Sequence, residues 1–548
     1  MGRTLFMKNI LIFLLIVSML LGLMGCGGEE AVKDLSGKYL LDEARNEAMI
    51  DDFGTVTVKN EGNARVYYHI FVGSFSDSNG DGIGDLRGII NRFDYLNDGD
   101  PNSGLSLGVE GIWLSPIFAS PSYHKYDTTD YYKIDPKFGT MEDLQELINL
   151  CHERGVQIIL DLVINHTSKS NAWFQQFTDV HQKGDTANQY YDFYTWGYDK
   201  IPGVTNYSIT GTSQYYEGNF SSEMPELNFD NELVRQAMVD VAKFYLDMGV
   251  DGFRFDAAKY IYYGDNPRSA AFWEWYMAEL RAIKPDIYTV AEVWDADAAT
   301  FPYFTSTNCF NFSMSQASGR IAETAKNGNV NSFVNYVDSY LDNIQAMRKD
   351  AMMVTFIANH DTDRAAGFLT TAGGYAYMAA NLSILLPGST FVYYGEEIGM
   401  LGSRGGANTD ANRRLAMLWG DGDTIKNPVG SNYKANQANG TVAEQLPNGN
   451  SLYNHYKKLI AIRKANPEIA YGTFTPLITT SKVGGFLCQY NGSQAAVFHN
   501  TTNKAVTLDL AKFTDVSLET LAAVVGLGGA TLDGTILTID AQTSVVLR

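Results

Sequence analysis

The sequence predicts an α/β protein: a closed (β/α)8 (TIM) barrel with a subdomain inserted after the third strand and a C-terminal antiparallel β-sandwich domain. Eight apolar, strand-like runs alternate with helical patterns, and alternating segments with Gly, Asn and Asp turns follow Gly472. Strands that alternate with helices are typical of a parallel sheet. A length of 548 residues accommodates one such barrel and smaller domains beside it.

The eight apolar runs define the barrel strands. They are 66–75, 108–116, 156–164, 250–256, 287–293, 309–314, 353–358 and 390–394. Helical patterns lie between them, at 141–153, 231–248 and 331–348, and a helix at 452–465 closes the series. We therefore assign the barrel to residues 63–166 and 231–470.

Two further domains are predicted from the remaining sequence. Residues 167–230 are rich in Tyr, Gly and Asn and are too long for a simple loop, which indicates an inserted domain. Residues 471–548 alternate β-like segments with turn residues, which indicates a separate β domain.

The N-terminus has the pattern of an export signal. Arg3 and Lys8 precede an apolar run at 10–24, which is short for a membrane span, although a retained anchor helix is the alternative. Leu23-Met24-Gly25-Cys26 resembles the bacterial lipobox, which implies cleavage after residues 1–25 and lipidation of Cys26. We expect an acidic spacer at 26–62 and a lipoprotein on the outer face of the cell membrane, or shed from it.

Composition excludes several classes of protein. Hydrophobic residues make up 45% and charged residues 19%, which excludes a disordered chain. The net charge of −21 disfavours binding to nucleic acid. Cys151, Cys309 and Cys488 are far apart and show no metal-ligand spacing. We expect a monomer with no nucleic-acid partner.

Charged residues lie at the ends of four predicted strands. Asp161 lies in the third run, Arg254 and Asp256 end the fourth, Glu292 lies at the end of the fifth, and Asp361 follows the seventh. Because working residues of such barrels gather at the carboxyl ends of the strands, we expect these side chains to meet at one rim.

Two of these carboxyl groups have contrasting surroundings. Arg254 and Asp256 are two residues apart on one strand and so face the same way, which should lower the pKa of Asp256, as a carboxylate nucleophile requires. Glu292 lies among apolar residues, where desolvation should raise its pKa, as a general acid requires. The alternative for Arg254 and Asp256 is a structural ion pair at the barrel mouth. The alternative for Glu292 is an ordinary capped strand end.

Four segments carry a family resemblance. Residues 161–166, 252–259, 292–294 and 356–361 resemble, in order, the four conserved regions of the α-amylase family, glycoside hydrolase family thirteen. The similarity extends to 111–116, 126–130, 386–388 and 394–397, so it covers roughly residues 65–470.

The resemblance implies roles for individual residues. Asp256 would be the nucleophile, Glu292 the acid/base and Asp361 the stabiliser of a retaining glycosidase, which works through a covalent glycosyl-enzyme. The implied substrate-binding residues are Tyr126, Asp127, His124, His166, Arg254, Lys259, His360 and Arg364.

A calcium loop follows the first strand. Asp77, Asn79, Asp81 and Asp85 place oxygen ligands at positions one, three, five and nine, and the Ile83 carbonyl would contribute another. Position twelve is Gly88 rather than the Glu of an EF-hand, so the loop resembles the calcium loop of part of the α-amylase family; a metal-free turn is the alternative. Asn165 matches a residue that ligates a second Ca²⁺ in many α-amylases, but the sequence does not identify its partners.

The position within the family rests on a fifth region. Met224-Pro-Glu226-Leu-Asn228 indicates a group intermediate between oligo-1,6-glucosidases and neopullulanases. Tyr260 and Lys125 replace the usual His and Gly, and both are expected to line subsites next to the cleavage point.

Three functions follow as hypotheses. The first is endo-hydrolysis of α-1,4 bonds in starch or maltodextrin. The second is an oligosaccharide α-glucosidase, a neopullulanase-like enzyme or a transglycosylase. The third is a non-catalytic glycan-binding lipoprotein, which the presence of all three acids disfavours.

Overall fold

We describe a computed structural model of the chain. It describes residues 55–56, 60, 62–370, 374–405, 409–434, 436–479 and 482–548. Cys26, the signal segment 1–25 and most of the spacer 26–62 lie outside these residues. Within the described part of the chain, no helix has the length and apolar character needed to span a membrane.

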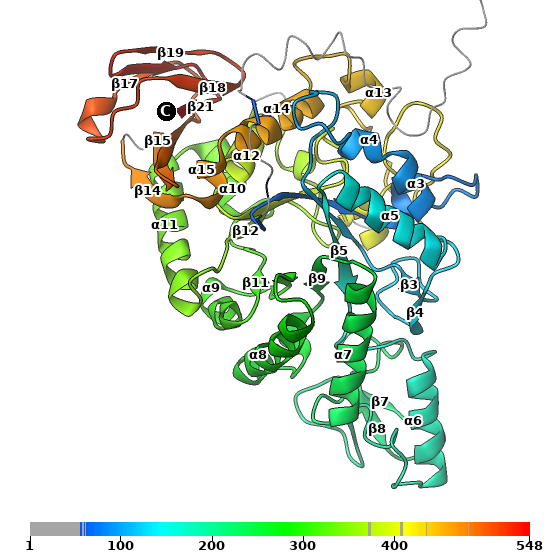
Figure 1. The fold of residues 1–548 in the computed structure, drawn as a ribbon. Coiled ribbons are helices and arrows are strands. Elements are labelled where there is room, and N and C mark those ends of the chain that lie inside the picture. Colours follow the sequence, from blue (N-terminus) through cyan, green and yellow to red (C-terminus); the bar gives the residue numbers. More distant parts are fainter. Residues whose placement is uncertain are drawn as a thin grey trace, which may run out of the picture.

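Eight parallel strands form a closed barrel, as predicted (Figure 1). In chain order they are β1 (Val66–Ile70), β2 (Gly111–Leu114), β5 (Gln157–Leu162), β9 (Gly252–Phe255), β10 (Tyr288–Ala291), β11 (Asn308–Cys309), β12 (Val354–Phe356) and β13 (Ser389–Tyr393). Neighbours pair in the order β11-β10-β9-β5-β2-β1-β13-β12. A parallel bridge between Phe310, directly after β11, and Val354 of β12 joins the two ends of this order and closes the barrel.

The sixth strand is shorter than the apolar run at 309–314 predicts. The ladder ends at Cys309, because the chain then turns: the Asn311 side-chain oxygen accepts a hydrogen bond from the Met314 amide at 3.2 Å. An apolar run alone does not reveal where such a turn begins.

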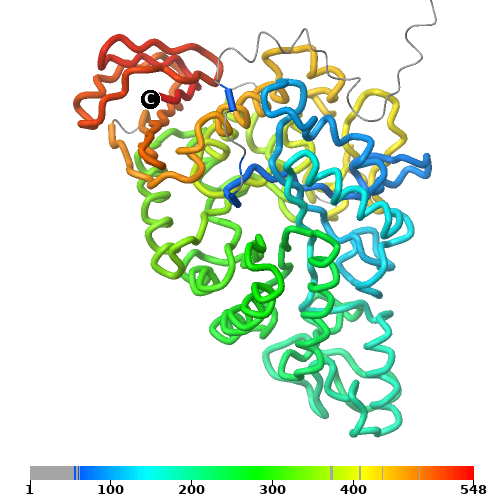
Figure 2. Tube along the Cα trace, in the orientation of Figure 1, coloured from blue at the N-terminus to red at the C-terminus, as the bar shows by residue number. Residues whose placement is uncertain are grey.

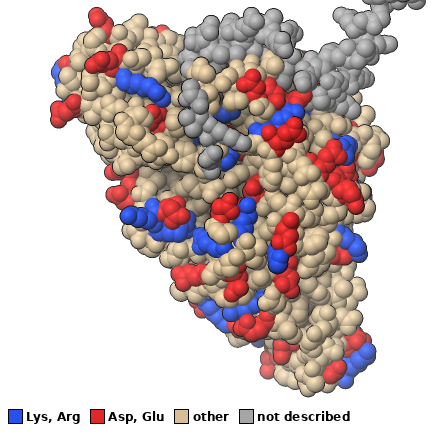
Figure 3. Space-filling model, in the orientation of Figure 1, with Lys and Arg blue, Asp and Glu red and all other residues tan. Residues whose placement is uncertain are grey.

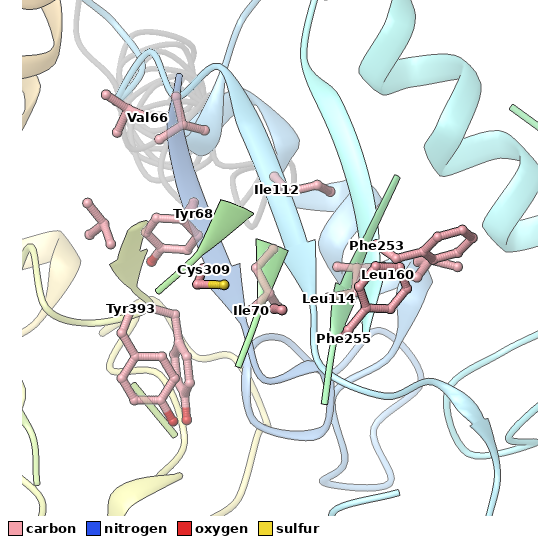
Figure 4. Close-up of a cluster of buried hydrophobic side chains, with 14 of the residues drawn as sticks. Val66, Tyr68, Ile70, Ile112, Leu114, Leu160, Phe253, Phe255, Cys309 and Tyr393 are labelled. Carbon is pink, nitrogen blue, oxygen red and sulfur yellow. The ribbon is translucent and has the colours of Figure 1, made fainter. Parts of the chain in front are cut away.

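Alternate residues of each strand face the barrel interior and the surrounding helices. Val66, Tyr68 and Ile70 of β1 belong to the large cluster outside the barrel (Figure 4). Tyr67 lies inside, where its ring stacks on Tyr288 at 4.8 Å and on Phe391 at 4.7 Å between ring centres. The packed interior makes the barrel a rigid support for the residues at its rim.

Helices surround the strands (Figure 1). They are α3 (Leu86–Asn91), α4 (Phe93–Leu96), α5 (Met141–Glu153), α7 (Glu232–Asp247), α8 (Asn266–Ile283), α9 (Asp297–Thr300), α10 (Arg320–Asn327), α11 (Val330–Met347), α12 (Tyr375–Ile384), α13 (Val442–Gln445), α14 (Leu452–Ala465) and α15 (Pro467–Tyr471). Helix α5 begins at Met141 because Thr140 and Asp143 form a capping box, which satisfies two amide groups of the first turn.

The inserted segment contains α6 (Ala172–Lys183) and a small antiparallel sheet. Its strands are β6 (Trp196–Gly197), β7 (Asn206–Ser208) and β8 (Tyr215–Glu217), in the order β6-β8-β7. A separate hairpin of β3 (Phe118–Ala119) and β4 (Asp130–Ile134) follows β2.

The C-terminal part of the chain forms two antiparallel sheets. One has the order β14-β15-β16-β21-β18, with strands Thr473–Leu477, Val483–Tyr490, Ser493–Asn500, Thr543–Leu547 and Leu521–Gly526. The other has the order β17-β20-β19, with strands Val506–Asp509, Ile536–Ile539 and Ala530–Asp533. This domain and the inserted domain lie at opposite ends of the molecule (Figure 2).

Charged side chains of both signs are interspersed over the face shown in Figure 3. No continuous basic area appears on that face, in keeping with the net charge of −21.

Candidate active site

The predicted acids lie where the barrel strands end. Asp256 directly follows β9, Glu292 directly follows β10, and Asp361 lies five residues after β12. Because the strands are parallel, these ends meet at one rim, and a pocket of about 830 Å³ opens there. All three acids line it, together with His124, Tyr126, His166 and Lys259.

Arg254 contacts two of these acids, Asp256 and Glu292, and also Asp161. Its buried guanidinium donates from Nη1 to Asp161 Oδ1 at 2.8 Å and to Asp256 Oδ1 at 2.7 Å, and from Nη2 to Glu292 Oε2. One guanidinium thus holds Asp256 and Glu292 together at the pocket floor. Two carboxyl groups fixed in this way can act on one glycosidic bond.

The pKa of Asp256 departs from the sequence-based expectation. Burial raises it above its ordinary value, and Arg254 lowers it by less than burial raises it. The prediction that the arginine would lower the net pKa was therefore wrong, because the barrel floor removes the carboxylate from water more effectively than a sequence reveals.

The pKa of Asp361 is shifted in the opposite direction, because neighbouring positive charge outweighs burial. Burial alone would raise its pKa, but His360 and Arg414 lower it well below the ordinary range. His360 Nε2 lies 2.8 Å from one carboxylate oxygen, and Arg414 Nη2 donates to the other at 2.7 Å. Asp361 is therefore held as an anion beside the pocket.

Tyr126 links Asp161, which contacts Arg254, to His360, which contacts Asp361. Its hydroxyl donates to Asp161 Oδ2 at 3.0 Å and accepts from His360 Nε2 at 2.6 Å, and its ring is parallel to that of His360. Burial raises the pKa of Asp161 to about 7, although Arg254 opposes this.

Sequence reasoning did not assign site roles to Asp161 or Arg414. Asp161 was visible as a charged residue in an apolar strand. Arg414 lies in a loop beyond β13, and it carried no comparable signal.

Four predicted substrate-binding residues do not line the pocket: Arg254 and His360, described above, and also Asp127 and Arg364. Asp127 accepts hydrogen bonds from the Ser120 and Ser122 hydroxyls. Arg364 donates to the carbonyl groups of Tyr394 at 2.7 Å and Arg413 at 3.0 Å. The structure thus places Arg364 as a support for the loop that carries Arg414.

The two departures from the family pattern have different placements. Tyr260 lines the pocket, and its ring lies 4.9 Å from that of Phe220 in the inserted domain. Lys125 does not line it, which corrects the expectation: its buried ammonium pairs with Asp135 at 2.7 Å. Lys125 has a φ of 65°, a left-handed conformation that favours glycine.

Lys259 and aromatic rings contribute to the pocket lining. Lys259 Nζ donates to the Trp294 carbonyl at 2.7 Å and to Asp295 at 3.1 Å. Trp294 lines the pocket and is 39% exposed, so its ring is accessible to a sugar.

The loop that follows β1 has the donor chemistry of a calcium site. Asp77 and Asp85 are buried, and neither forms an ion pair with a described cationic side chain. Burial raises the pKa of Asp85, and Asp77 adds to the rise. Two buried carboxylates without a counter-charge fit a bound cation.

The loop carboxylates do not converge as a set of three. Within the described ranges, no three His, Cys, Asp or Glu side chains are grouped to hold a metal. The Asp77 carboxylate accepts hydrogen bonds from the backbone amides of Asn79, Gly80 and Gly82, so much of its capacity to accept hydrogen bonds is already used within the loop. A cation here would depend also on Asn79 and the Ile83 carbonyl.

Asn165 uses both ends of its amide within the protein. Nδ2 donates to Glu226 Oε2 at 2.5 Å, and Oδ1 lies 2.5 Å from His166 Nδ1. Asn165, which was predicted to ligate a second Ca²⁺, therefore has two protein partners in the structure.

Comparison with known proteins agrees with the fold. Residues 69–472 match the family model described as "Alpha amylase, catalytic domain". The chain is 36% identical over 442 residues to "Alpha-amylase 3" of Dictyoglomus thermophilum, covering 79% of this chain and 84% of that protein. It is 30% identical over 463 residues to "4-alpha-glucanotransferase" of Thermotoga maritima, covering 81% and 97%.

Solved structures show the same similarity. Amy13B of Eubacterium rectale superposes with a TM-score of 0.84 at 32% identity, covering 92% of this chain and 98% of that one. The α-amylase from H. orenii superposes with a TM-score of 0.78 at 36% identity, covering 89% and 99%. The chain therefore belongs to the α-amylase family, glycoside hydrolase family thirteen.

Proposed function

We propose that this protein hydrolyses internal α-1,4-glucosidic bonds of starch and maltodextrins with retention of configuration. The observation that carries the proposal is the single guanidinium of Arg254, which contacts both Asp256 and Glu292 at the floor of the pocket. The similarity to a relative named "Alpha-amylase 3" supports this choice of activity.

The roles are those that the family resemblance implies, and the placement of the three acids at one pocket supports them. Asp256 attacks the anomeric carbon while Glu292 gives its proton to the glycosidic oxygen, so the bond to the leaving sugar breaks as a glycosyl ester forms. Glu292, now a base, takes a proton from water, which attacks the ester and releases Asp256. Asp361, held as an anion by His360 and Arg414, stabilises positive charge on the sugar ring in both steps.

Parallel digestion of amylose, pullulan and maltotriose tests the proposal. Internal cutting should reduce the viscosity and iodine staining of amylose before glucose accumulates. The Asp256→Asn variant should be inactive on all three, and activity retained by it would refute the assigned nucleophile.

Transfer to a sugar acceptor is a second candidate activity. Phe220, Tyr260 and Trp294 line one side of the pocket, and aromatic rings there would retain an acceptor sugar in competition with water. The relative named "4-alpha-glucanotransferase" supports this alternative. Products longer than maltotriose in the maltotriose digest would favour it.

We further propose that the loop Asp77–Asp85 binds Ca²⁺. Its oxygen donors support this proposal, as do the buried carboxylates of Asp77 and Asp85, which form no ion pair with a described cationic side chain. The metal would stabilise the loop that joins β1 to α3 rather than take part in bond cleavage.

We also propose that the chain is a lipoprotein acylated at Cys26. The charged start, the short apolar run and the lipobox-like sequence support it. Metabolic labelling with a palmitate analogue in a bacterial host should mark the wild-type protein but not Cys26→Ser, and equal labelling of both would contradict the proposal.

A further inference from the structure

The backbone around Arg414 is held by side chains from other parts of the chain. The Arg413 carbonyl accepts hydrogen bonds from Arg364 Nε at 3.0 Å and from the Tyr393 hydroxyl at 3.1 Å. The Arg414 carbonyl accepts from the Ser74 hydroxyl at 2.7 Å. Two consecutive carbonyl groups are thus fixed at the residue that reaches into the pocket.

Arg364 is a buried cation that connects several backbone segments. It is 2% exposed, and besides the bond to Arg413 its Nη1 donates to the carbonyl of Tyr394, directly after β13, at 2.7 Å. Its own amide donates to the Gly402 carbonyl at 2.9 Å. The guanidinium lies 4.5 Å and 4.6 Å from the ring centres of Tyr393 and Tyr394. Because a guanidinium presents its donors in one fixed plane, Arg364 holds the end of β13 and Arg413 in a fixed relation.

The side chain of Arg414 depends on this fixed backbone. Arg414 is 5% exposed, its Nε donates to the His360 carbonyl at 3.0 Å, and its Nη2 donates to Asp361 Oδ1 at 2.7 Å. The neighbouring Arg413 donates from Nη1 to the Asp361 carbonyl at 2.7 Å. Arg364 lies three residues after Asp361. The segment after β12 therefore holds the loop, and the loop in turn holds Asp361.

The contact between Arg414 and Asp361 is sensitive to the position of the loop. A hydrogen bond from a guanidinium to a carboxylate weakens steeply with distance and angle, and a displacement of about 1 Å at such a site can be costly for a reaction. A residue that fixes the Arg413 carbonyl group therefore controls how Asp361 is held.

We propose that Arg364 is a positioning residue that acts through the Arg413 carbonyl group to place Arg414 against Asp361, and that it does not bind sugar. Arg414 and Asp361 line the pocket, whereas Arg364 does not. The effect on catalysis rests on the proposed function, but the placement of Arg414 does not.

Arg463 provides a matched control. It is also 2% exposed, and its guanidinium also donates to backbone carbonyl groups, those of Ile384 at 2.7 Å, Leu386 and Gly388. Gly388 directly precedes β13, at the end of the strand away from the pocket. Arg463→Lys should therefore lower stability without moving Arg414.

Hydrogen exchange of the full chain measures the placement of Arg414 without substrate. A lysine ammonium cannot reproduce the planar bonds of Arg364, so the backbone amides of residues 411–416 should exchange on the order of tenfold faster in Arg364→Lys. In Arg463→Lys the peptide that contains these residues should exchange as in the wild type. Wild-type exchange of this peptide in Arg364→Lys, or equal acceleration in both variants, would overturn the proposal.

Kinetics on maltodextrin separate positioning from sugar binding. In Arg364→Lys kcat should fall on the order of tenfold, the size expected for one lost hydrogen bond to a charged group, with KM little changed. Both constants should keep their wild-type values in Arg463→Lys. A raised KM with an unchanged kcat would indicate direct sugar binding by Arg364 and overturn the proposal.

A double-mutant cycle with Arg414→Gln tests whether Arg364 acts through Arg414. In that background Arg364→Lys should change kcat by less than about twofold, because the guanidinium that it positions is already absent. Effects that multiply would contradict the proposal. If Arg364→Lys does not fold, Tyr393→Phe, which removes the other donor to the Arg413 carbonyl, takes its place with the same expected and contradicting results.

The two kinds of measurement fail separately. If the protein proved inactive on α-glucans, the proposed function would fail, while hydrogen exchange in Arg364→Lys and Arg463→Lys would still decide whether Arg364 places the loop.

Discussion

At the scale of single residues, burial and one arginine determine the acid–base behaviour of the site. Arg254 serves Asp161, Asp256 and Glu292 at once, so its charge is divided among three carboxyl groups. Burial then prevails at Asp256 and Asp161, whose pKa values are raised, whereas the pKa of Asp361, which contacts both His360 and Arg414, is lowered.

The acid limb of the pH profile should respond to Asp161. If Asp256 is the nucleophile it must be ionised, so kcat/KM should fall as the pH drops through its raised pKa. The variant Asp161→Asn removes a nearby carboxylate and leaves more of the Arg254 charge to Asp256. The acid limb should therefore move to lower pH, although the apparent pKa belongs to the coupled pair. An acid limb that stays in place or moves to higher pH would contradict this.

Lys125 offers a test of stability at a single residue. Lys125→Gly relieves the left-handed backbone but leaves Asp135 buried without its partner, so we expect a net loss of about 3 kcal/mol in the free energy of unfolding. The double variant with Asp135→Asn should recover part of the loss. Urea unfolding of the three proteins measures it, and a more stable single variant would show that the ion pair contributes little.

At the scale of elements, the sequence predicted most of the framework. The apolar runs located all eight barrel strands, and the helical pattern at 141–153 coincides with α5, because periodicity and the Thr140 cap are local properties. The end of β11 was missed, since the turn at Asn311 depends on pairing with β12. The contacts of Arg364 were missed for the same reason, because its partners Tyr394 and Arg413 lie far from it in the chain. The pairing of Lys125 with nearby Asp135 was missed because it depends on the hairpin of β3 and β4.

Calcium removal tests the loop between β1 and α3. If Ca²⁺ binds there, excess chelator should lower the melting temperature, because a ligand at about 100 times its Kd stabilises a protein by about 2.7 kcal/mol. Asp77→Asn should abolish the calcium-dependent part. Asp100→Asn, in a different loop that is also closed by Asx hydrogen bonds, should retain it. Equal melting temperatures of the wild type with and without calcium would refute the metal site.

At the scale of the whole molecule, a rigid barrel carries the acids, and the inserted domain completes the pocket. The sequence predicted that Asp256, Glu292 and Asp361 would meet at one rim, and it could do so because each lies at or near a strand end. The residues that the inserted domain contributes to the pocket could not be predicted from the sequence. The contacts of Phe220 with Tyr260 and of Glu226 with Asn165 arise only when that domain folds back over the rim.

The central claim is that Asp256 attacks the sugar while Glu292 and Asp361 assist at the same glucosidic bond. The most direct measurement is mass spectrometry of the protein after reaction with a fluorinated α-glucosyl fluoride, which slows hydrolysis of a glycosyl-enzyme. We expect one added sugar, located on the peptide that contains Asp256 and absent from Asp256→Asn. A sugar attached to another residue, or turnover that inverts the anomeric centre without a covalent adduct, would contradict it.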